Sequence, residues 1–384
     1  MIRLFSVKNY RNFRDTLVLD FTHTHDYQYN ENCIKNGLIN DVIIYGKNSV
    51  GKTNLGVALY DIVYNAILSY NPRLFRLGDA YKNADAEIDD LIKFSYSFLF
   101  DGDIIDYEYC KTDAVTVVSE KFMVNGELIF EYDSQIRQYN FDNVAKINAG
   151  TINWNEFFNL LTSEVDINDD DAGKPTALRY IIHNTLQNEQ SVISKLTRFI
   201  KGMKFTDSSL YPSLEYSRYF ALNKKYLLEE DELGKFQQFL NEYGVECKLI
   251  LLDQPDGSKE IYFDYKKPLP FTKTMSSGTA ELTQFYLKYM CGSKPSFIYI
   301  DEFDAYYHYE LSERIVKLLE NVFTCQVVLT SHNTNLLSNS IMRPDCFMIL
   351  DKGKLIPICE ATNRELRQGH NLEKLYINGE FDEY

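Results

Sequence analysis

Short apolar runs and amphipathic stretches take turns along the second half of the chain. The apolar runs predict buried strands at 296–300, 326–330 and 346–350. The amphipathic stretches between them predict helices at 279–290, 310–322 and 333–339. This alternation of strand and helix is typical of a parallel sheet with helical crossovers.

The first half opens with a different pattern. Alternating residues predict strands at 2–8 and 16–21, and the apolar run "DVIIY" at 41–45 predicts a buried strand. A glycine-rich stretch, "GKNSVGKTN", follows directly. Apolar residues then recur on one helical face from Leu55 to Ile67. The order is therefore strand, glycine-rich loop, helix.

Residues 92–132 predict two β-hairpins. Their turns are expected at Asp101-Gly102 and at Asn125-Gly126, because such dipeptides favour tight hairpin turns. Hairpins of this kind indicate an antiparallel edge layer beside the parallel sheet.

Residues 133–245 are more polar and mostly helical in pattern, with a loop expected at 163–175. We therefore predict an α/β fold: a domain with a mixed central sheet, an antiparallel β edge layer and a mainly helical insertion. Residues 1–132 and 246–384 would form the two lobes of one split domain, and 133–245 the insertion.

Composition narrows the classes further. The 384 residues carry a net charge of −15, which argues against a uniformly basic nucleic-acid coat. The seven cysteines are scattered and form no CxxC pair, which excludes a zinc ribbon and fits a reducing cytosol. No apolar run of about 18 residues is present, so we expect a cytoplasmic protein with no membrane span.

The glycine-rich stretch matches the phosphate-loop pattern G-x-x-x-x-G-K-[ST] without a gap. Its backbone N–H groups and the following helix dipole would face a polyphosphate. Lys52 would reach the β- and γ-phosphates, and the Thr53 hydroxyl would ligate Mg²⁺. The alternative is a chance glycine-rich turn. The residues expected to line the nucleotide are Gly46, Lys47, Asn48, Ser49, Val50, Gly51, Lys52, Thr53 and Asn54.

Two acids end the buried run "SFIYI". Asp301 could hold the Mg²⁺ shell, and Glu302 could orient and polarise an attacking water. Asp304 continues into a turn. The alternative is a polar strand end before a helix cap.

The next apolar run ends in Ser331-His332. A histidine there could hydrogen-bond a γ-phosphate and sense its presence. A lone histidine at a strand end is more often structural, but its place one strand–helix unit after the two acids favours the functional interpretation.

Ser276, Ser277 and Gly278 open the predicted helix at 279–290. A serine hydroxyl and bare N–H groups at a helix start could bind the open face of the γ-phosphate. The segment could come from a second copy of the chain. The alternative is a plain serine cap.

In order, the chain gives "GKNSVGKT", "MSSGTAEL", "IYIDEFD" and "LTSH". This series resembles the ABC-class ATPases of the SMC/RecF/OLD-like group, and the C-terminal tail is similar to the ATPase subunit of PARIS-type and related abortive-infection phage-defence systems. The N-terminal "VKNYRNFRD" looks like the opening of that group.

The resemblance implies ATP and Mg²⁺ as ligands and assigns a role to each matching position. Lys52 and Thr53 would be the Walker A pair, and Asp301 and Glu302 the Walker B pair. Ser277 and Gly278 would form the signature segment, which acts in trans. Asp304 would be the D-loop acid and His332 the switch histidine. Arg11 would contact the nucleotide. Thr279 and Tyr309 depart from the family pattern, and no Q-loop glutamine can be placed.

The resemblance leaves two main functions open. The first is an anti-phage ATPase that forms a homodimer or higher even-numbered oligomer and controls a separate effector, expected to be a nuclease, for which a Toprim-type enzyme is one candidate; a phage-encoded protein could be the trigger. The second is a RecF/SMC-like DNA-repair ATPase that binds DNA when ATP is bound. A scaffold with slow ATP turnover is a third.

Four basic residues within 194–204 could meet nucleic acid or an acidic partner, although a solvated helix face is the better interpretation.

Overall fold

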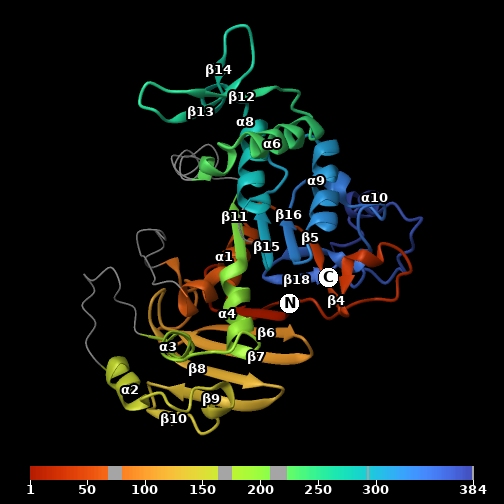
Figure 1. Ribbon diagram of the computed structural model, residues 1–384. Coiled ribbons are helices and arrows are strands. Elements are labelled where there is room, and N and C mark those ends of the chain that lie inside the picture. The colour runs from red at the N-terminus through yellow and green to blue at the C-terminus, as the bar shows by residue number, and fades with distance from the viewer. Residues whose placement is uncertain (68–79, 163–174, 208–222, 292–293, 383–384) are drawn as a thin grey trace.

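The computed structural model describes residues 1–67, 80–162, 175–207, 223–291 and 294–382. Two large sheets organise this part of the chain (Figure 1). One is a six-stranded central sheet and the other a seven-stranded antiparallel sheet.

The central sheet has the strand order β11-β15-β16-β5-β17-β18, in which every neighbouring pair but the last is parallel. Every residue of its three middle strands is buried, as expected for a parallel sheet covered on both faces. The bounds are β5 (Asp41–Tyr45), β11 (Met203–Asp207), β15 (Phe297–Asp301), β16 (Gln326–Thr330), β17 (Phe347–Asp351) and β18 (Lys354–Pro357).

The antiparallel sheet has the order β10-β9-β8-β7-β6-β1-β2. Buried and more exposed residues alternate along β7, so one face of the sheet packs inward. Both predicted hairpins are confirmed, and the turn residues Asp101, Gly102, Asn125 and Gly126 all have positive φ. The bounds are β1 (Ile2–Lys8), β2 (Leu17–Asp20), β6 (Ile92–Phe100), β7 (Asp103–Lys111), β8 (Val117–Val124), β9 (Glu127–Asp133) and β10 (Gln138–Asn140).

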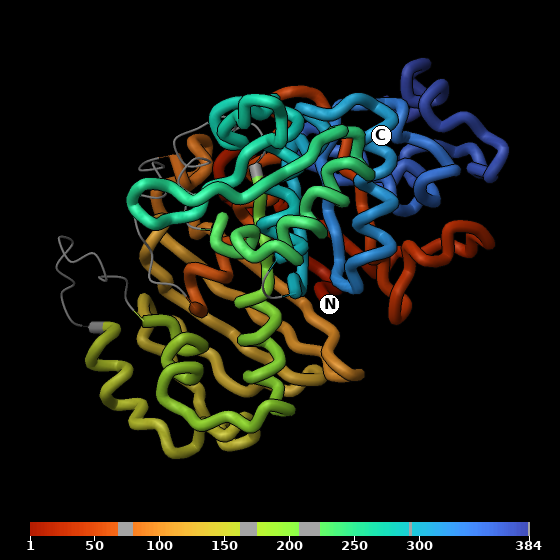
Figure 2. Tube along the Cα trace, turned by 45° about the horizontal axis from the view of Figure 1, so that its top comes forward, coloured from red at the N-terminus to blue at the C-terminus, as the bar shows by residue number. Residues whose placement is uncertain are grey.

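The two sheets are joined at the N-terminus, which lies between them in both views (Figures 1 and 2). The buried side chain of Gln326 in β16 accepts from the backbone N of Ile2 at 2.6 Å and donates to its carbonyl at 2.9 Å. The amide therefore bonds β1 of one sheet to β16 of the other.

Helices cover the central sheet and connect it to the antiparallel sheet. α1 follows β5, α8 runs on into a π-helical segment (Tyr286–Met290), and α9 crosses from β15 to β16. None of the described helices is both long enough and apolar enough to cross a bilayer. The bounds are α1 (Lys52–Ala66), α2 (Trp154–Thr162), α3 (Ala177–Asn184), α4 (Val192–Gly202), α6 (Glu230–Glu242), α7 (Phe271–Thr274), α8 (Ser277–Phe285), α9 (Tyr309–Val322) and α10 (Leu372–Ile377).

A third, small sheet projects at the end of the molecule away from the antiparallel sheet (Figure 1). It consists of β12 (Leu249–Asp253), β13 (Lys259–Phe263) and β14 (Leu269–Pro270). A two-stranded ribbon, β3 (Ile34–Lys35) with β4 (Leu38–Ile39), precedes β5. Short helical turns complete the described elements: η1 (Glu31–Cys33), η3 (Val144–Ile147), η5 (Lys224–Leu227), η7 (Thr334–Leu336) and η8 (Pro344–Cys346).

The predicted fold class is confirmed, with a mixed central sheet and an antiparallel layer. The helix predicted at 333–339 was wrong in extent, because only the 3-10 turn Thr334–Leu336 forms there. The expected loop at 163–175 lies outside the described residues except for Pro175. The division of the chain at 133 and 246 stays a prediction; β11, from within 133–245, pairs in parallel with β15 of the central sheet.

α1 is packed between the two sheets. Gly56 faces the central sheet so closely that an added Cβ would come within 2.5 Å of the rings of Phe205 and Tyr299. On the other side, the Tyr96 hydroxyl of β6 donates to the carbonyl of Ala58 at 3.0 Å. The helix that follows the glycine-rich loop therefore contacts both layers directly.

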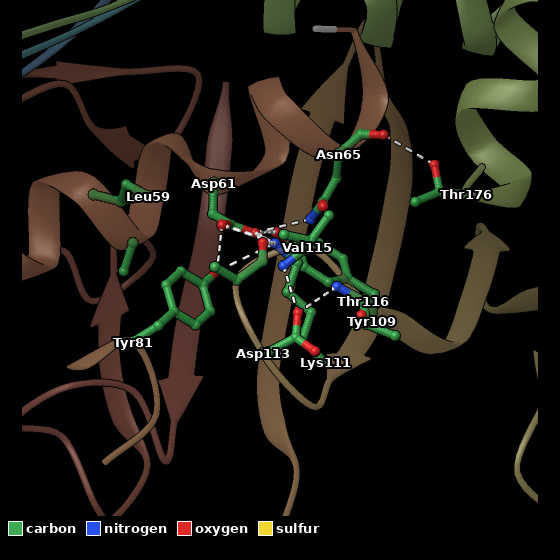
Figure 3. Close-up of polar contacts among 12 residues, drawn as sticks. Leu59, Asp61, Asn65, Tyr81, Tyr109, Lys111, Asp113, Val115, Thr116 and Thr176 are labelled. Carbon is green, nitrogen blue, oxygen red and sulfur yellow. Dashed lines mark hydrogen bonds and ion pairs between the residues drawn. The ribbon is translucent and has the colours of Figure 1, made fainter. Parts of the chain in front are cut away.

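A buried ion pair adds to this packing (Figure 3). Lys111 of β7 donates to both carboxylate oxygens of Asp61 in α1, at 3.0 and 2.8 Å. Tyr81 and Tyr109 donate their hydroxyls to the same carboxylate at 2.5 and 2.8 Å, and Asn65 donates at 2.8 Å. Burial lowers the pKa of Lys111, and the Asp61 carboxylate opposes that shift. The carboxylate is thus fully satisfied, which a buried ion pair needs in order to be stable.

Candidate functional site

The glycine-rich loop connects the end of β5 to the start of α1. Gly51 has φ +109°, and an added Cβ would lie 2.3 Å from the side-chain nitrogen of Asn12. At Gly46 an added Cβ would lie 2.5 Å from the backbone oxygen of Leu350. Glycine is required at both ends of the loop for steric reasons, as expected for a backbone that wraps a phosphate group.

Lys52 begins α1 and its ammonium group turns back over the loop. It donates to the carbonyls of Gly46 at 2.8 Å and Lys47 at 3.2 Å, and to His332 Nε2 at 2.9 Å. Burial lowers the pKa of Lys52, and the carboxylates of Asp301 and Glu302 raise it again. Lys52 therefore connects Walker A to the predicted switch histidine within one chain.

Asp301 ends β15 beside the start of α1. Its Oδ2 accepts from the Thr53 hydroxyl at 2.5 Å, and its Oδ1 accepts from the Thr330 hydroxyl at 2.6 Å. The side chain of Asp301 is buried. The predicted metal pair, Thr53 and Asp301, is thus brought into direct contact.

Thr330 is a site residue that the sequence analysis missed. Its hydroxyl also accepts from the backbone N of Glu302 at 2.8 Å, so it holds Asp301 and the next residue at once. The signal that could have identified Thr330 is its position as the last residue of β16, the strand that pairs with β15 in the sheet. Carboxyl ends of neighbouring parallel strands meet at one edge of a sheet.

Glu302 has φ +48°, a left-handed conformation that a glutamate rarely adopts. Such a backbone costs about 1–3 kcal/mol and persists only where the surroundings fix it. Here Thr330 fixes the backbone on either side of the Glu302 side chain. Its hydroxyl accepts from the backbone N of Glu302, and its carbonyl accepts from the backbone N of Phe303 at 3.2 Å. The half-buried Glu302 side chain is thereby directed by a strained turn.

Asp304 and His332 belong to the same edge. The Ser331 hydroxyl donates to Asp304 Oδ2 at 2.8 Å, and burial is the main cause that raises the pKa of Asp304. The pKa of His332 is lowered from its ordinary value of 6.5, first by desolvation and then by the Lys52 ammonium. A neutral His332 can accept the hydrogen bond from Lys52.

Arg11 lies at the base of the phosphate loop. Its guanidinium donates to Asn54 Oδ1, and Asn54 donates to Asn12 Oδ1 at 2.6 Å. Asn12 in turn donates to the carbonyl of Val50 at 2.7 Å. The structure therefore brings Arg11 to the loop, and it adds Asn12, which the sequence analysis missed although it stands next to Arg11 in "NYRNF".

The signature segment is arranged differently. Ser276, rather than Ser277, caps α8 by accepting from the backbone N of Thr279 at 3.1 Å. Ser277 is exposed, and its hydroxyl has no hydrogen-bond partner among the described residues. An added Cβ on Gly278 would come within 3.3 Å of the Tyr306 carbonyl. No described hydrogen bond joins this segment to the phosphate loop of the same chain.

The assembled residues fit a magnesium-bound nucleoside triphosphate. The loop has steric room only for glycine at its two ends, and the Lys52 ammonium now rests on carbonyl oxygens where phosphate oxygens could replace them. The Thr53 hydroxyl and the Asp301 carboxylate are oxygen donors of the kind that Mg²⁺ prefers.

Comparison with known proteins gives one family and several solved structures. The family model described as "AAA domain, putative AbiEii toxin, Type IV TA system" matches residues 42–338, more than half of the chain. No curated protein matches the chain.

Three solved structures are similar over nearly the whole chain. The SMC head domain from Thermotoga maritima is 13% identical, with a TM-score of 0.44, and covers 93% of this chain and 98% of its own. An SMC head bound to the C-terminal winged-helix domain of ScpA is 14% identical, with a TM-score of 0.44 and coverages of 92% and 96%. An SMC head with an extended coiled coil, bound to the C-terminal domain of ScpA derived from Pyrococcus furiosus, is 12% identical, with a TM-score of 0.41 and coverages of 92% and 95%.

Proposed function

The chain belongs to the family described as "AAA domain, putative AbiEii toxin, Type IV TA system", and from this premise we propose that it is an ABC-class ATPase. It binds ATP with Mg²⁺, two copies close around the nucleotide, and hydrolysis controls a separate effector. The observation that carries the proposal is a pair of hydrogen-bonded groups that meet at adjacent residues of α1: Lys52 bonds His332, and Thr53 bonds Asp301, which also bonds Thr330.

Each residue of this set has a distinct task. Lys52 and the loop N–H groups bind the β- and γ-phosphates. Thr53 and Asp301 hold Mg²⁺, which neutralises charge on the phosphates. Glu302 orients the attacking water and takes its proton, while His332 contacts the γ-phosphate and reports its presence to Lys52.

The second subunit would supply Ser277 and Gly278. The exposed Ser277 hydroxyl and the first N–H groups of α8 are available to an anion at that helix start. Ser331 donates a hydrogen bond to Asp304, and the turn that contains Asp304 also contains Tyr306, whose carbonyl lies close to Gly278. Because the signature segment and the D-loop turn lie close together, dimer closure at one of them can move residues at the carboxyl edge of the central sheet.

Replacing Glu302 with glutamine tests the hydrolytic part. We expect Glu302→Gln to reduce phosphate release by roughly 10²–10⁴-fold, because it removes the general base, while ATP binding persists. The matched control is Glu313→Gln, on the half-exposed surface of α9, where Glu313 forms an ion pair with Lys317 and with no other described residue. Equal turnover in the two variants would remove Glu302 from the mechanism.

Control of an effector in anti-phage defence is the finer part of the proposal. It is supported by the order of the four motifs, by the resemblance of the tail to defence ATPases, and by a family description that names a putative toxin. A nuclease encoded beside this gene is the expected effector, and a phage protein the expected trigger. Co-expression should yield a stable complex and protect cells from phage; full protection by this chain alone would contradict effector control.

One feature favours a second function, ATP-dependent DNA binding. A cavity of about 460 Å³ beside α4 is lined by the basic residues Arg198, Lys201 and Lys294. Affinity for duplex DNA measured with and without ATP over a salt series separates the two functions, because phosphate contacts give a steep loss of affinity with salt. If DNA affinity depends on ATP and its dependence on salt becomes less steep in Arg198→Glu, DNA binding is favoured. If the protein has no measurable affinity for DNA, control of an effector is favoured.

A further inference from the structure

Three potential metal ligands meet at the end of β5 that lies away from the phosphate loop. Cys33 closes η1, Asp41 opens β5, and Glu320 lies in the last turn of α9. The Cys33 sulfur and one carboxylate oxygen from each acid all lie within 4.8 Å of one another. Cys33 Sγ and Glu320 Oε1 are 3.6 Å apart. Two neighbouring elements near the N-terminus and one helix far along the chain thus direct a thiol and two carboxylates to one point.

Two of the three residues are buried, and one carboxylate oxygen lacks a partner. Cys33 is 0% and Asp41 1% exposed. Asp41 Oδ1 accepts from the Asn40 amide at 3.0 Å, but Oδ2 has no hydrogen-bond partner among the described residues. A buried carboxylate oxygen left unsatisfied costs about 1–3 kcal/mol or more. A cation bound at this point would coordinate the unsatisfied oxygen and remove that cost.

The nearby ammonium group does not fill this role. Lys35 is close enough to influence both acids electrostatically, yet its Nζ donates to the carbonyl of Phe323 at 3.3 Å. No ion pair joins Lys35 to Asp41 or Glu320 in the described part of the chain. The buried Asp41 and the half-buried Glu320 therefore share this site without a cation in contact.

The described residues bring three ligands to this point, one thiol and two carboxylates. Zn²⁺ accepts three protein ligands with water in the fourth position.

We propose that Cys33, Asp41 and Glu320 form a binding site for Zn²⁺ or a similar borderline-soft divalent cation, with water in the fourth position. Zn–S and Zn–O bonds of about 2.3 and 2.1 Å at tetrahedral angles place a sulfur and an oxygen ligand roughly 3.6 Å apart. Cys33 Sγ now donates a hydrogen bond to Glu320 Oε1 at 3.6 Å, so these two atoms already have the separation that the ion requires. A thiolate ligand selects against Mg²⁺ and Ca²⁺, which prefer oxygen ligands.

The site is separate from the nucleotide. Asp41 and Tyr45 are the two ends of β5, so at about 3.3 Å per residue the cluster lies roughly 13 Å from the start of the phosphate loop. The cation would tie β5, which leads into that loop, to α9, which follows the catalytic acids. Its role is to fix these elements relative to each other, and it takes no part in hydrolysis.

Binding of the metal alone to the full-length protein tests the proposal. Purified chain is stripped with a chelator and titrated with Co²⁺, a spectroscopic substitute for Zn²⁺. We expect one equivalent to bind with thiolate-to-cobalt charge-transfer absorption, one equivalent of Zn²⁺ to displace it, and elemental analysis to find about one zinc per chain. Absence of the charge-transfer band together with a substoichiometric zinc content would overturn the proposal.

Variants locate the site. Cys33→Ser should abolish the charge-transfer band or weaken Co²⁺ binding at least about tenfold, and Asp41→Asn should weaken it without loss of the thiolate signal. The control is Cys247→Ser, a half-buried cysteine of the segment before β12, which should bind as wild type does. If Cys33→Ser binds cobalt like wild type, the assignment is wrong. Should Cys33→Ser fail to fold, the melting temperature of the wild-type protein provides the test. A chelator should lower it and added Zn²⁺ should restore it. If neither changes the melting temperature, the site is excluded.

Discussion

The two sheets of this protein handle their polar groups in opposite ways. In β5, β15 and β16 of the central sheet every residue is buried, and the polar residues stand at the strand ends: Asp301 and Thr330 at the carboxyl edge, Asp41 and Gln326 at the opposite edge. In the antiparallel sheet the polar residues Lys111 and Glu120 point into the core instead, and both are held by several hydrogen bonds.

This difference separates chemistry from support. At the edge of the central sheet, the three donors of Lys52 rest on two loop carbonyls and on His332, partners that phosphate oxygens can replace. Against the antiparallel sheet, the Asp61 carboxylate of α1 is saturated by four side chains and is shielded from solvent (Figure 3). We infer that the antiparallel sheet acts as a rigid support for α1, while the parallel edge carries the reaction.

The largest effect should come from breaking the support. Lys111→Met leaves Asp61 buried without its cation, so we expect a loss of about 3–5 kcal/mol in the free energy of unfolding. The more exposed pair Lys93–Glu108, which joins β6 to β7, is the matched control; Lys93→Met should cost about 0–1 kcal/mol. Denaturant unfolding of both variants measures the two losses.

The double variant Asp61→Leu with Lys111→Met sharpens this result. Because no charge is then left unpaired, much of the stability should return. If the double variant is as unstable as Lys111→Met alone, the loss comes from packing and the ion pair is not its cause.

Breaking the edge should spare the fold and remove activity. Lys52→Ala deletes the phosphate-binding ammonium, and we expect ATP turnover to fall by about 10²–10³-fold or more, with weaker nucleotide binding by calorimetry. Lys266→Ala, on an exposed turn before β14, serves as the control. Turnover within a few-fold of wild type in Lys52→Ala would contradict the phosphate-loop assignment.

The smallest effect concerns pH. The folded-state pKa of His332 is lowered, so the unfolded chain binds more protons between that pKa and 6.5. Stability should therefore decrease as pH falls through this window, and it should do so less in His332→Gln. The difference should be small because His332 is exposed. Melting temperatures of both proteins from pH 7.5 to 5 measure it; parallel curves would contradict a neutral His332 beside Lys52.

Much of the fold could be predicted because its elements are local. The strand–loop–helix unit at 41–67 and the two hairpins are set by periodicity and by turn residues that tolerate positive φ. The helix expected at 333–339 failed because "SHNTNLL" mixes short polar residues that bond their own backbone: Asn333 accepts from the backbone N of Asn335. That competition leaves only a 3-10 turn.

The site divides in the same way. Lys52, Thr53, Asp301 and Glu302 lie in local motifs and could be recognised. Thr330 could not, because its role depends on which strands are neighbours. The metal cluster was equally inaccessible to sequence, since Cys33 and Glu320 are 287 residues apart.

The central claim is that Ser277 of one chain completes the site built around Lys52 of another. Mixing two inactive variants, Lys52→Ala and Ser277→Arg, tests it most directly. In a heterodimer, one of the two composite sites is intact, so statistical pairing in a two-fold dimer should restore about a quarter of wild-type ATP turnover. If the mixture stays as inactive as either variant alone while heterodimers form, or if Ser277→Arg is fully active by itself, the nucleotide is not shared between two chains.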